Sequence, residues 1–463
     1  MIFSSWAFAL FFTVVILGLL VSPSRNYRSW FLLAASLFFY GYWDVRFLPL
    51  ILFTTWIDFE VGKYIHRSKS SRFRRWLLAA SVVANLGVLG IFKYANFLLT
   101  TANALFVSTG WHFRTLDIVL PLGISFFTFQ SMNYTIDIYR NKLAPTKRYR
   151  DFLFFVSFFP HLIAGPLVRA ANFLPQVARP VTLRWRNFES GIWLFSQGLV
   201  KKLLIADRIA FFVDPVFSDP ASYSGSTLLL AVIAYSIQIY CDFSGYSDMA
   251  IALARSLGFT FPENFRMPYL SLNVTEFWQR WHITLSNWLR DYLYISLGGN
   301  RKGKRRTYVN LFITMALGGL WHGASWNFVI WGVLHGSALA LHRMLSRDLK
   351  TPLLTHMPNW LAWLLTYAFV CFCWVFFRAP TLVDAALILR KIVTWDSYGV
   401  GWYYTGVLLW IPVIILANWI GRHKGLPQLS LTSFRGAFAL LMIVLALIAF
   451  APLQSSPFIY FQF

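Results

Sequence analysis

Long apolar stretches separated by short polar segments run through this chain from its first residues to its last. A transmembrane α-helix needs about 20 predominantly apolar residues, and a backbone in lipid has to satisfy its hydrogen bonds internally. Several of the stretches are too short or too polar to cross alone. The pattern therefore predicts an all-α polytopic membrane protein with about eleven transmembrane helices. The apolar stretches cover residues 2–21, 30–43, 47–62, 76–98, 152–168, 188–212, 227–254, 309–322, 326–344, 360–378, 402–420 and 436–453.

Two further segments combine apolar residues with polar groups and helix breakers. Residues 118–139 contain Pro121, Gly123 and Gln130, and residues 152–169 contain Pro160, His161 and Pro166. Broken, polar segments at membrane depth are tolerated only where protein or a water-filled cavity covers them. We therefore expect re-entrant or tilted pieces around an internal cavity.

Residues 274–297 show the period of one long amphipathic helix. At about 100° per residue, Glu276, Arg280 and Arg290 share a polar face, and Trp278 and Trp281 lie on the opposite face. Such a helix would lie along the membrane interface or line a funnel. His282 falls on the apolar arc, one turn from Trp278 and from Ser286, so its ring is predicted to point into protein.

The composition excludes a soluble protein, because 57% of the residues are hydrophobic and only 13% are charged. The first stretch has no basic segment before it and no small-residue cleavage site after it, so it is predicted to be a retained span. Cys241, Cys371 and Cys373 lie in apolar stretches and suggest neither a disulfide framework nor a zinc site. No soluble domain or long linker is visible, which predicts one membrane domain over residues 1–463. We divide it into N-terminal helices (1–150), a catalytic core (151–345) and C-terminal helices (346–463).

The net charge of +23 comes from short basic clusters between apolar spans. This distribution fits the positive-inside rule of membrane topology and not a nucleic-acid-binding face, so we expect the lipid bilayer and no nucleic acid as a partner. Arg25 and Arg28 after the first span, and Arg422, Lys424 and Arg435 before the last, place both termini outside the cytoplasm. The expected location is the bacterial inner membrane with both termini periplasmic.

His322 is the most informative single residue, because an ionisable imidazole in a sequence apolar enough to span a membrane costs free energy and is typical of a functional site. The basic residues 301–306 just before its helix are expected in the cytoplasm. At about 1.5 Å per residue, a helix from Asn310 places His322 roughly 18 Å above the helix start, past the middle of a core about 30 Å thick. We interpret His322 as a general base, with His282 as the second member of a buried pair that orients the acceptor or stabilises the developing oxyanion. Structural histidines in helix packing are the alternative.

Other polar residues are candidates for binding substrate. Asp242 and Asp248 lie at membrane depth and either line the cavity or pair with Arg266, Arg280 or Arg290. His161 lies in a broken segment, and cavity wall and packing are both open for it. The cations of residues 301–306 either bind the phosphates of a donor or serve topology alone. His335 lies thirteen residues beyond His322, on a different face of an unbroken helix, and is left outside the site. The substrate-binding candidates are Trp278, Ser286, Arg290, Asp291, Asn300, Trp321, Tyr246, Asp248 and His161, and no metal site is predicted.

Long motifs in the chain resemble the membrane-bound O-acyltransferase family, in particular its branch of alginate O-acetyltransferases and related cellulose-acetylation and D-alanyl-transfer proteins. They are PHLIAGPLVR (160–169), YCDFSGYSDMAIALA (240–254), PENFRMPYLSLNVTEFWQRWHITLSNWLRDYLYISLGGNR (262–301) and LGGLWHG (317–323), with the opening MIFSSW and the closing SPFIYFQF. The resemblance implies that His322 is the essential catalytic residue and that His282 occupies the second active-site position. It also implies a ring of helices around a central pore.

The resemblance further implies transfer of acetyl groups from cytoplasmic acetyl-CoA, a co-substrate and not a bound cofactor, toward hydroxyls of a secreted polysaccharide such as alginate or cellulose. A periplasmic acetyltransferase partner protein and a polysaccharide synthesis complex are the implied protein partners. D-alanyl transfer to teichoic acid from a carrier-protein thioester is the alternative within the enzyme class. A transporter whose histidines relay protons, and a scaffold with structural histidines, are the alternatives outside it.

Overall fold

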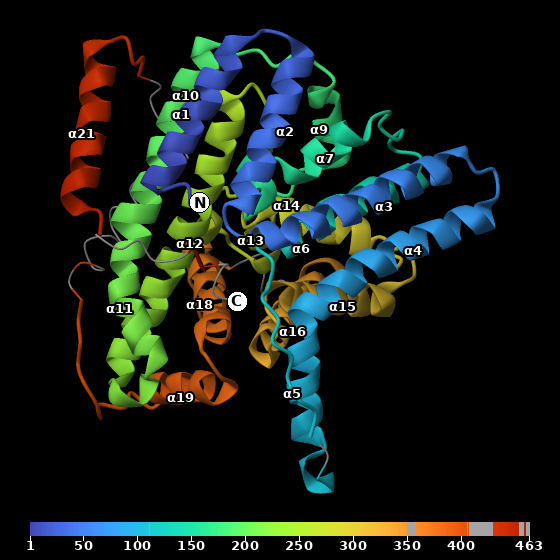
Figure 1. Ribbon diagram of the computed structural model, residues 1–463. Coiled ribbons are helices and arrows are strands. Elements are labelled where there is room, and N and C mark those ends of the chain that lie inside the picture. Colours follow the sequence, from blue (N-terminus) through green and yellow to red (C-terminus); the bar gives the residue numbers. More distant parts are fainter. Residues whose placement is uncertain (111, 350–356, 405, 407–428, 453–457, 460–463) are drawn as a thin grey trace. The chain divides into compact units, whose positions relative to one another are not determined.

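The computed structural model describes residues 1–110, 112–349, 357–404, 406, 429–452 and 458–459. These residues form helices and no β-strand, which confirms the all-α prediction (Figure 1). The chain packs as two compact units, each described here by itself. Unit 1 comprises residues 1–192 and 250–262, and unit 2 comprises residues 193–249 and 263–463. The predicted single domain and its three regions stay predictions.

Unit 1 begins with a series of helices joined by short turns. α3 and α4 form a hairpin that packs on α6 (Figure 1). The elements are α1 (Trp6–Val21), α2 (Arg25–Gly41), η1 (Val45–Phe47), α3 (Leu48–Arg67), α4 (Ser71–Leu89), η2 (Gly90–Tyr94), α5 (Ala95–Leu105), η3 (Val107–Thr109), α6 (Ile124–Tyr139), α7 (Tyr149–Ser157), α8 (Phe159–Leu162) and α9 (Ala170–Val177). α10 (Trp185–Leu199) begins in unit 1 and ends in unit 2.

The helical part of the polar segment 118–139, α6, is covered by protein, as expected, whereas Val119 before it is exposed. Every residue of α6 from Ile124 to Thr135 is buried. A buried carboxylate, Asp58 of α3, accepts hydrogen bonds from Ser81 (2.5 Å), Asn85 (2.8 Å) and Ser131 (2.5 Å). Because each of these donors comes from α4 or α6, the polar groups of this segment join three helices instead of facing lipid.

The predicted break within residues 152–169 is also present. α7 ends at Ser157, Phe158 is extended (ψ 114°), and the short α8 ends at Leu162. Burial of all residues from Phe152 to Val168 covers the non-helical backbone with protein, as a break at membrane depth requires.

Unit 2 contains the long helix α12 and a helical hairpin. The bounds are η4 (Val200–Ala206), α11 (Asp207–Ser218), η5 (Pro220–Ser222), α12 (Gly225–Ser256), η6 (Pro268–Leu270), α13 (Val274–Arg280), α14 (Ile283–Trp288), η7 (Leu289–Tyr294), α15 (Lys304–His322), α16 (Trp326–Arg343), η8 (Met344–Asp348), α18 (Asn359–Arg378), α19 (Leu382–Val393) and α21 (Phe434–Phe450). The last turns of α12 belong to unit 1.

α15 and α16 form an antiparallel hairpin whose backbones approach closely. A Cβ on Gly319 would lie 2.1 Å from the carbonyl oxygen of Phe328, and one on Gly332 would lie 2.3 Å from that of Met315. Only glycine permits this approach. The hairpin places His322, the last residue of α15, directly before its turn.

The prediction of one helix over residues 274–297 is wrong. α13 ends at Arg280, and His282 adopts a left-handed backbone conformation (φ 42°) before α14 begins. After α14, residues 289–294 form a π-helical turn, η7. The amphipathic period of the sequence does not continue as one helix. Phe277 and Trp281, two aromatic side chains of its apolar face, pack against each other in the core of unit 2 where α13 ends.

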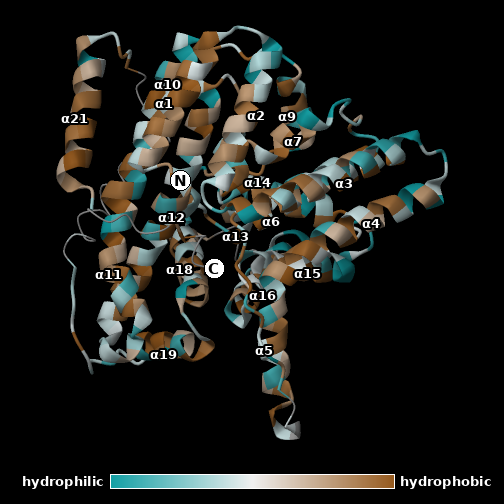
Figure 2. Ribbon diagram, in the orientation of Figure 1, coloured by the Kyte–Doolittle hydropathy of each residue, from teal (hydrophilic) through white to brown (hydrophobic). Residues whose placement is uncertain are grey.

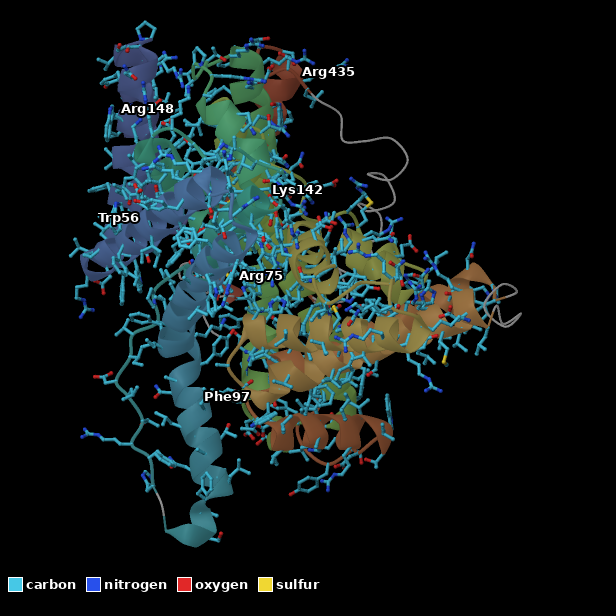
Figure 3. The ribbon with its side chains drawn as sticks, turned by 90° about the vertical axis from the view of Figure 1, so that its right-hand side faces the viewer. Trp56, Arg75, Phe97, Lys142, Arg148 and Arg435 are labelled. Atoms are coloured by element: carbon cyan, nitrogen blue, oxygen red, sulfur yellow. The ribbon has the colours of Figure 1, made fainter. Side chains whose placement is uncertain are left out.

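Large apolar side chains remain exposed on several helices. Trp6 of α1 is 88% exposed and Phe434 of α21 is 85% exposed, and Figure 2 shows α21 coloured as hydrophobic along most of its length. In unit 1, Figure 3 labels Trp56 on α3 and Phe97 on α5, and Trp56 is half-exposed. Such surfaces suit a hydrocarbon environment.

Four described helices are long and apolar enough to cross a membrane by length and composition. They are residues 71–105, 225–256, 326–348 and 359–378, and α1 and α21 are shorter apolar helices. The predicted count of about eleven crossings stays a prediction. The predicted stretch 402–420 lies largely outside the described residues.

Candidate functional site

His322 ends α15 in an aromatic pocket of unit 2. Its side chain is buried, and its ring centroid lies 5.0 Å from Trp321, 5.0 Å from Trp331 and 5.4 Å from Phe377. Trp331 comes from α16 and Phe377 from α18. Three helices therefore hold the imidazole, and Gly323 directly after it ends α15.

His282 lies beside it, between α13 and α14. The residue is completely buried, and its ring contacts Phe243 of α12 at 4.7 Å and Trp321 at 6.2 Å. The two imidazole centroids lie 6.5 Å apart. The two histidines thus come together from segments forty residues apart, with Trp321 in contact with both rings.

Polar groups hold His282 in its unusual backbone conformation. Its Nδ1 lies 3.1 Å from Oδ1 of Asn264. The same oxygen accepts hydrogen bonds from the hydroxyl (2.8 Å) and the amide (3.3 Å) of Thr284, and the carbonyl of Asn264 accepts from the amide of Ile283 (2.9 Å). Asn264 therefore caps the first amides of α14 from a distant segment, since α14 has no local side-chain cap.

His335 belongs to the same aromatic environment, although sequence reasoning left it outside. The residue is completely buried, its Nδ1 accepts a hydrogen bond from Trp278 Nε1 (3.3 Å), and its ring lies 4.8 Å from Trp331. The argument from an unbroken helix failed because the turn after His322 reverses the chain. Gly323, directly after His322, was the residue in the sequence that could have indicated this turn.

The carboxylates of α12 are paired, but not with the predicted arginines. Asp248 pairs with Lys201 (2.6 Å) and Asp242 with Lys202 (2.7 Å). The close approach of Gly198 to the carbonyl of Gly245 brings η4 against α12 and so delivers both lysines. The predicted arginines pair with neighbours on their own segments: Arg266 with Glu263, Arg280 with Glu276, and Arg290 with Asp291.

The remaining predicted binding residues of unit 2 lie at varied positions, and their role stays a prediction. Trp321 contacts both catalytic candidates, and Trp278 contacts Trp331 at 5.7 Å. Tyr246 is buried against Phe458 at 4.6 Å. Ser286 donates a hydrogen bond to the carbonyl of Trp281 (3.2 Å). Arg290 and Asn300 are exposed.

His161 lies in the core of unit 1. The residue is completely buried, and its Nε2 lies 2.8 Å from the carbonyl oxygen of Phe155, to which it donates. Phe158, Phe173 and Phe261 surround the ring at 5.2–5.8 Å. These contacts account for His161 as a packed core residue, and its role toward substrate stays a prediction.

The basic segment 301–306 is exposed, and its cations are available to an anionic ligand. Lys304 lies 3.7 Å from a carboxylate oxygen of Asp348, and within the described residues the other cations of this segment form no ion pair. Within the described ranges, no group of three or more His, Cys, Asp or Glu side chains is arranged to hold a metal ion. Among the described residues, the candidate site consists of buried imidazoles beside indole and phenyl rings.

Comparison with known proteins gives a consistent result. Residues 42–382 match the model of the membrane-bound O-acyltransferase family. The chain is 40% identical to a probable alginate O-acetylase of Pseudomonas putida over the full length of both proteins. It is 46% identical to the probable alginate O-acetylase of Pseudomonas aeruginosa, over 86% of this chain and 76% of the relative. It is 42% identical to a peptidoglycan O-acetyltransferase of Helicobacter pylori, over 79% of this chain and 73% of the relative.

Proposed function

Because this chain belongs to the membrane-bound O-acyltransferase family, we propose that it transfers acetyl groups from cytoplasmic acetyl-CoA to hydroxyls destined for a secreted polysaccharide. The names of its relatives, which are O-acetylases of alginate and of peptidoglycan, support acetyl transfer to a glycan. The observation that carries the proposal is the buried pair of His322 and His282, with ring centroids 6.5 Å apart. An ionisable pair buried inside a membrane protein is typical of a functional site.

In the proposed reaction, His322 is the general base. It takes the proton of the attacking hydroxyl while the hydroxyl oxygen forms a bond to the thioester carbonyl carbon. The C–S bond of the thioester then breaks, and the proton returns to the sulfur. The products are an acetyl ester and free CoA, and His322 is regenerated. An imidazole suits this role, because its ring nitrogen can accept the hydroxyl proton and later return it.

The proposal also assigns sides of the membrane. CoA is a large polyanion that stays in the cytoplasm, whereas the polymer is completed outside. The exposed cations of residues 301–306 suit the phosphates of the donor. On the other side, a periplasmic acetyltransferase partner would receive the acetyl group and pass it to the polymer within the synthesis complex.

Substitution of the proposed base tests the assignment. We expect His322→Ala to lower the acetyl-ester content of the secreted polymer by about 100-fold or more, as for loss of a general base. His112→Ala is the matched control, because His112 is an exposed histidine of unit 1. Both proteins must be present in membranes at the wild-type level. Normal acetylation by His322→Ala at that level would refute the role of His322.

Donor competition tests the substrate class. We expect a photoreactive acyl-CoA analogue to label the purified protein, and acetyl-CoA to prevent that labelling. Competition by an acylated carrier protein and not by acetyl-CoA would instead favour D-alanyl transfer. Absence of any competable labelling would favour transport.

A further inference from the structure

The orientation of one buried amide, that of Asn264, follows from its neighbours. The backbone amide of Thr284 can only donate, so the Asn264 atom that it meets at 3.3 Å is the oxygen. The amide nitrogen, Nδ2, then points to the hydroxyl of Ser247 at 3.1 Å. The opposite orientation would place two donors against each other at Thr284. All four side chains of this network, those of Ser247, Asn264, His282 and Thr284, are buried.

This orientation determines which ring nitrogen of His282 carries the proton. Nδ1 of His282 lies 3.1 Å from Oδ1 of Asn264, and a carbonyl oxygen only accepts. Nδ1 is therefore the protonated nitrogen. A neutral imidazole has one N–H, so Nε2 carries a lone pair. Nε2 is buried and has no hydrogen-bond partner among the described residues.

We propose that Asn264 is a positioning residue that holds His282 as the Nδ1–H tautomer, so that Nε2 accepts a hydrogen bond from a hydroxyl of the acceptor. This inference rests on the proposed acetyl transfer and narrows it. An imidazole with a lone pair at Nε2 cannot donate to an oxyanion through that atom. Of the two roles left open for His282, orientation of the acceptor is the one that the network supports.

The assignment also describes the acceptor. The reacting hydroxyl loses its proton to His322, so the hydrogen bond to Nε2 of His282 comes from a second hydroxyl of the acceptor, which is the periplasmic partner protein or a sugar. Asn264 itself touches neither the donor nor the acceptor in this arrangement, and it acts only through His282.

The tautomer can be measured without any activity assay. In protein labelled with ¹⁵N-histidine and reconstituted in lipid, nitrogen NMR distinguishes protonated from unprotonated ring nitrogens, and the His282 signals are identified by their loss in His282→Gln. We expect Nδ1 protonated and Nε2 unprotonated in the wild type. Ser247→Ala, which removes the partner of Asn264 Nδ2 only, should leave this state unchanged. Asn264→Leu should produce a mixture of tautomers.

Activity then separates positioning from structural support. In membrane vesicles supplied with radiolabelled acetyl-CoA, we expect Asn264→Leu to lower acetyl incorporation into polymer by about 10-fold or more. Asn264→Asp keeps an acceptor for Nδ1–H and should restore transfer, with the acidic limb of its pH profile moved to higher pH because a carboxylate favours the protonated imidazole. A merely structural asparagine would change the amount of folded protein and not this limb.

The outcomes distinguish the two proposals. An active wild-type protein with Nε2 of His282 protonated would overturn the inference and leave acetyl transfer intact. Equal pH profiles for wild type and a folded, active Asn264→Asp would overturn it as well. Wild-type vesicles that incorporate no acetyl group above vesicles lacking the protein would instead overturn the proposed function.

Discussion

At the scale of single residues, unit 2 contains a buried ammonium group, that of Lys202, whose charge must be compensated by its neighbours. Lys202 lies between two carboxylates, 2.8 Å from Asp207 and 2.7 Å from Asp242, and all three side chains are buried. Removal of a charge from water costs several kcal/mol per ion, so such a group is stable only while its partners remain. The backbone amide of Ile459 also donates to Asp242 (2.8 Å), which attaches a residue near the end of the chain to the same group.

We therefore expect Lys202→Met to lower the free energy of unfolding by about 3–5 kcal/mol, because two carboxylates then remain buried without their cation. The measurement is the apparent Tm of the purified protein in detergent, followed by tryptophan fluorescence. Lys201→Met is the matched control. Its pair with Asp248 is partly exposed, so we expect a loss of roughly 1 kcal/mol or less. Equal losses for the adjacent lysines would contradict the burial argument.

The sequence predicted that His322 and His282 form a buried pair, and their ring centroids lie 6.5 Å apart, while their catalytic roles stay predictions. It was not sufficient to find the partners of the buried groups. Lys201 and Lys202 pair with α12 only because Gly198 and Gly245 allow two helices to approach. Asn264 meets His282 through a loop that carries no periodic pattern. These contacts depend on tertiary packing, which the local pattern does not encode.

At the scale of elements, long apolar helices were predictable and the break at His282 was not. The polar period of residues 274–297 continues across the break, so counting faces could not detect it. What stabilises the break is the remote cap of α14 by Asn264, together with the packing of Phe277 against Trp281. By contrast, the apolar stretch 309–322 ends at His322, and so does α15.

The α15–α16 hairpin gives a prediction at this scale. Gly319→Ala would place a methyl group 2.1 Å from the carbonyl oxygen of Phe328, a backbone atom that cannot rotate away. We expect the helices to separate, at a cost of about 1–3 kcal/mol, and acetylation to fall because His322 lies one turn further on. The apparent Tm and the acetyl-ester content of the polymer measure the two effects.

The control for this substitution has the opposite expected sign. Gly87 lies within α4, and a methyl group added to it would have no other atom within 4 Å. Gly87→Ala should therefore raise stability by roughly 0.5–1 kcal/mol through helix propensity, without loss of acetylation. If Gly319→Ala behaved like Gly87→Ala, close packing of the hairpin would not matter for the site.

At the scale of the whole molecule, the distribution of charge along the chain predicts which segments face the cytoplasm. Basic clusters alternate with nearly uncharged segments along the chain, and the net charge is +23. If this charge serves membrane topology, each cluster faces the cytoplasm. The donor would then meet the exposed cations of residues 301–306 on the side where CoA is present, and the acetyl group would leave toward the other side.

Accessibility of introduced cysteines tests that arrangement. The native Cys241, Cys371 and Cys373 are buried, so a membrane-impermeant maleimide should leave the wild-type protein unlabelled in spheroplasts. Ser108 lies exposed in the segment with few charges, and Lys302 lies exposed in the basic segment. We expect Ser108→Cys to be labelled in intact spheroplasts and Lys302→Cys only after the membrane is permeabilised. Labelling of Lys302→Cys in sealed spheroplasts would place the basic segment outside, and the donor could not then enter on that face.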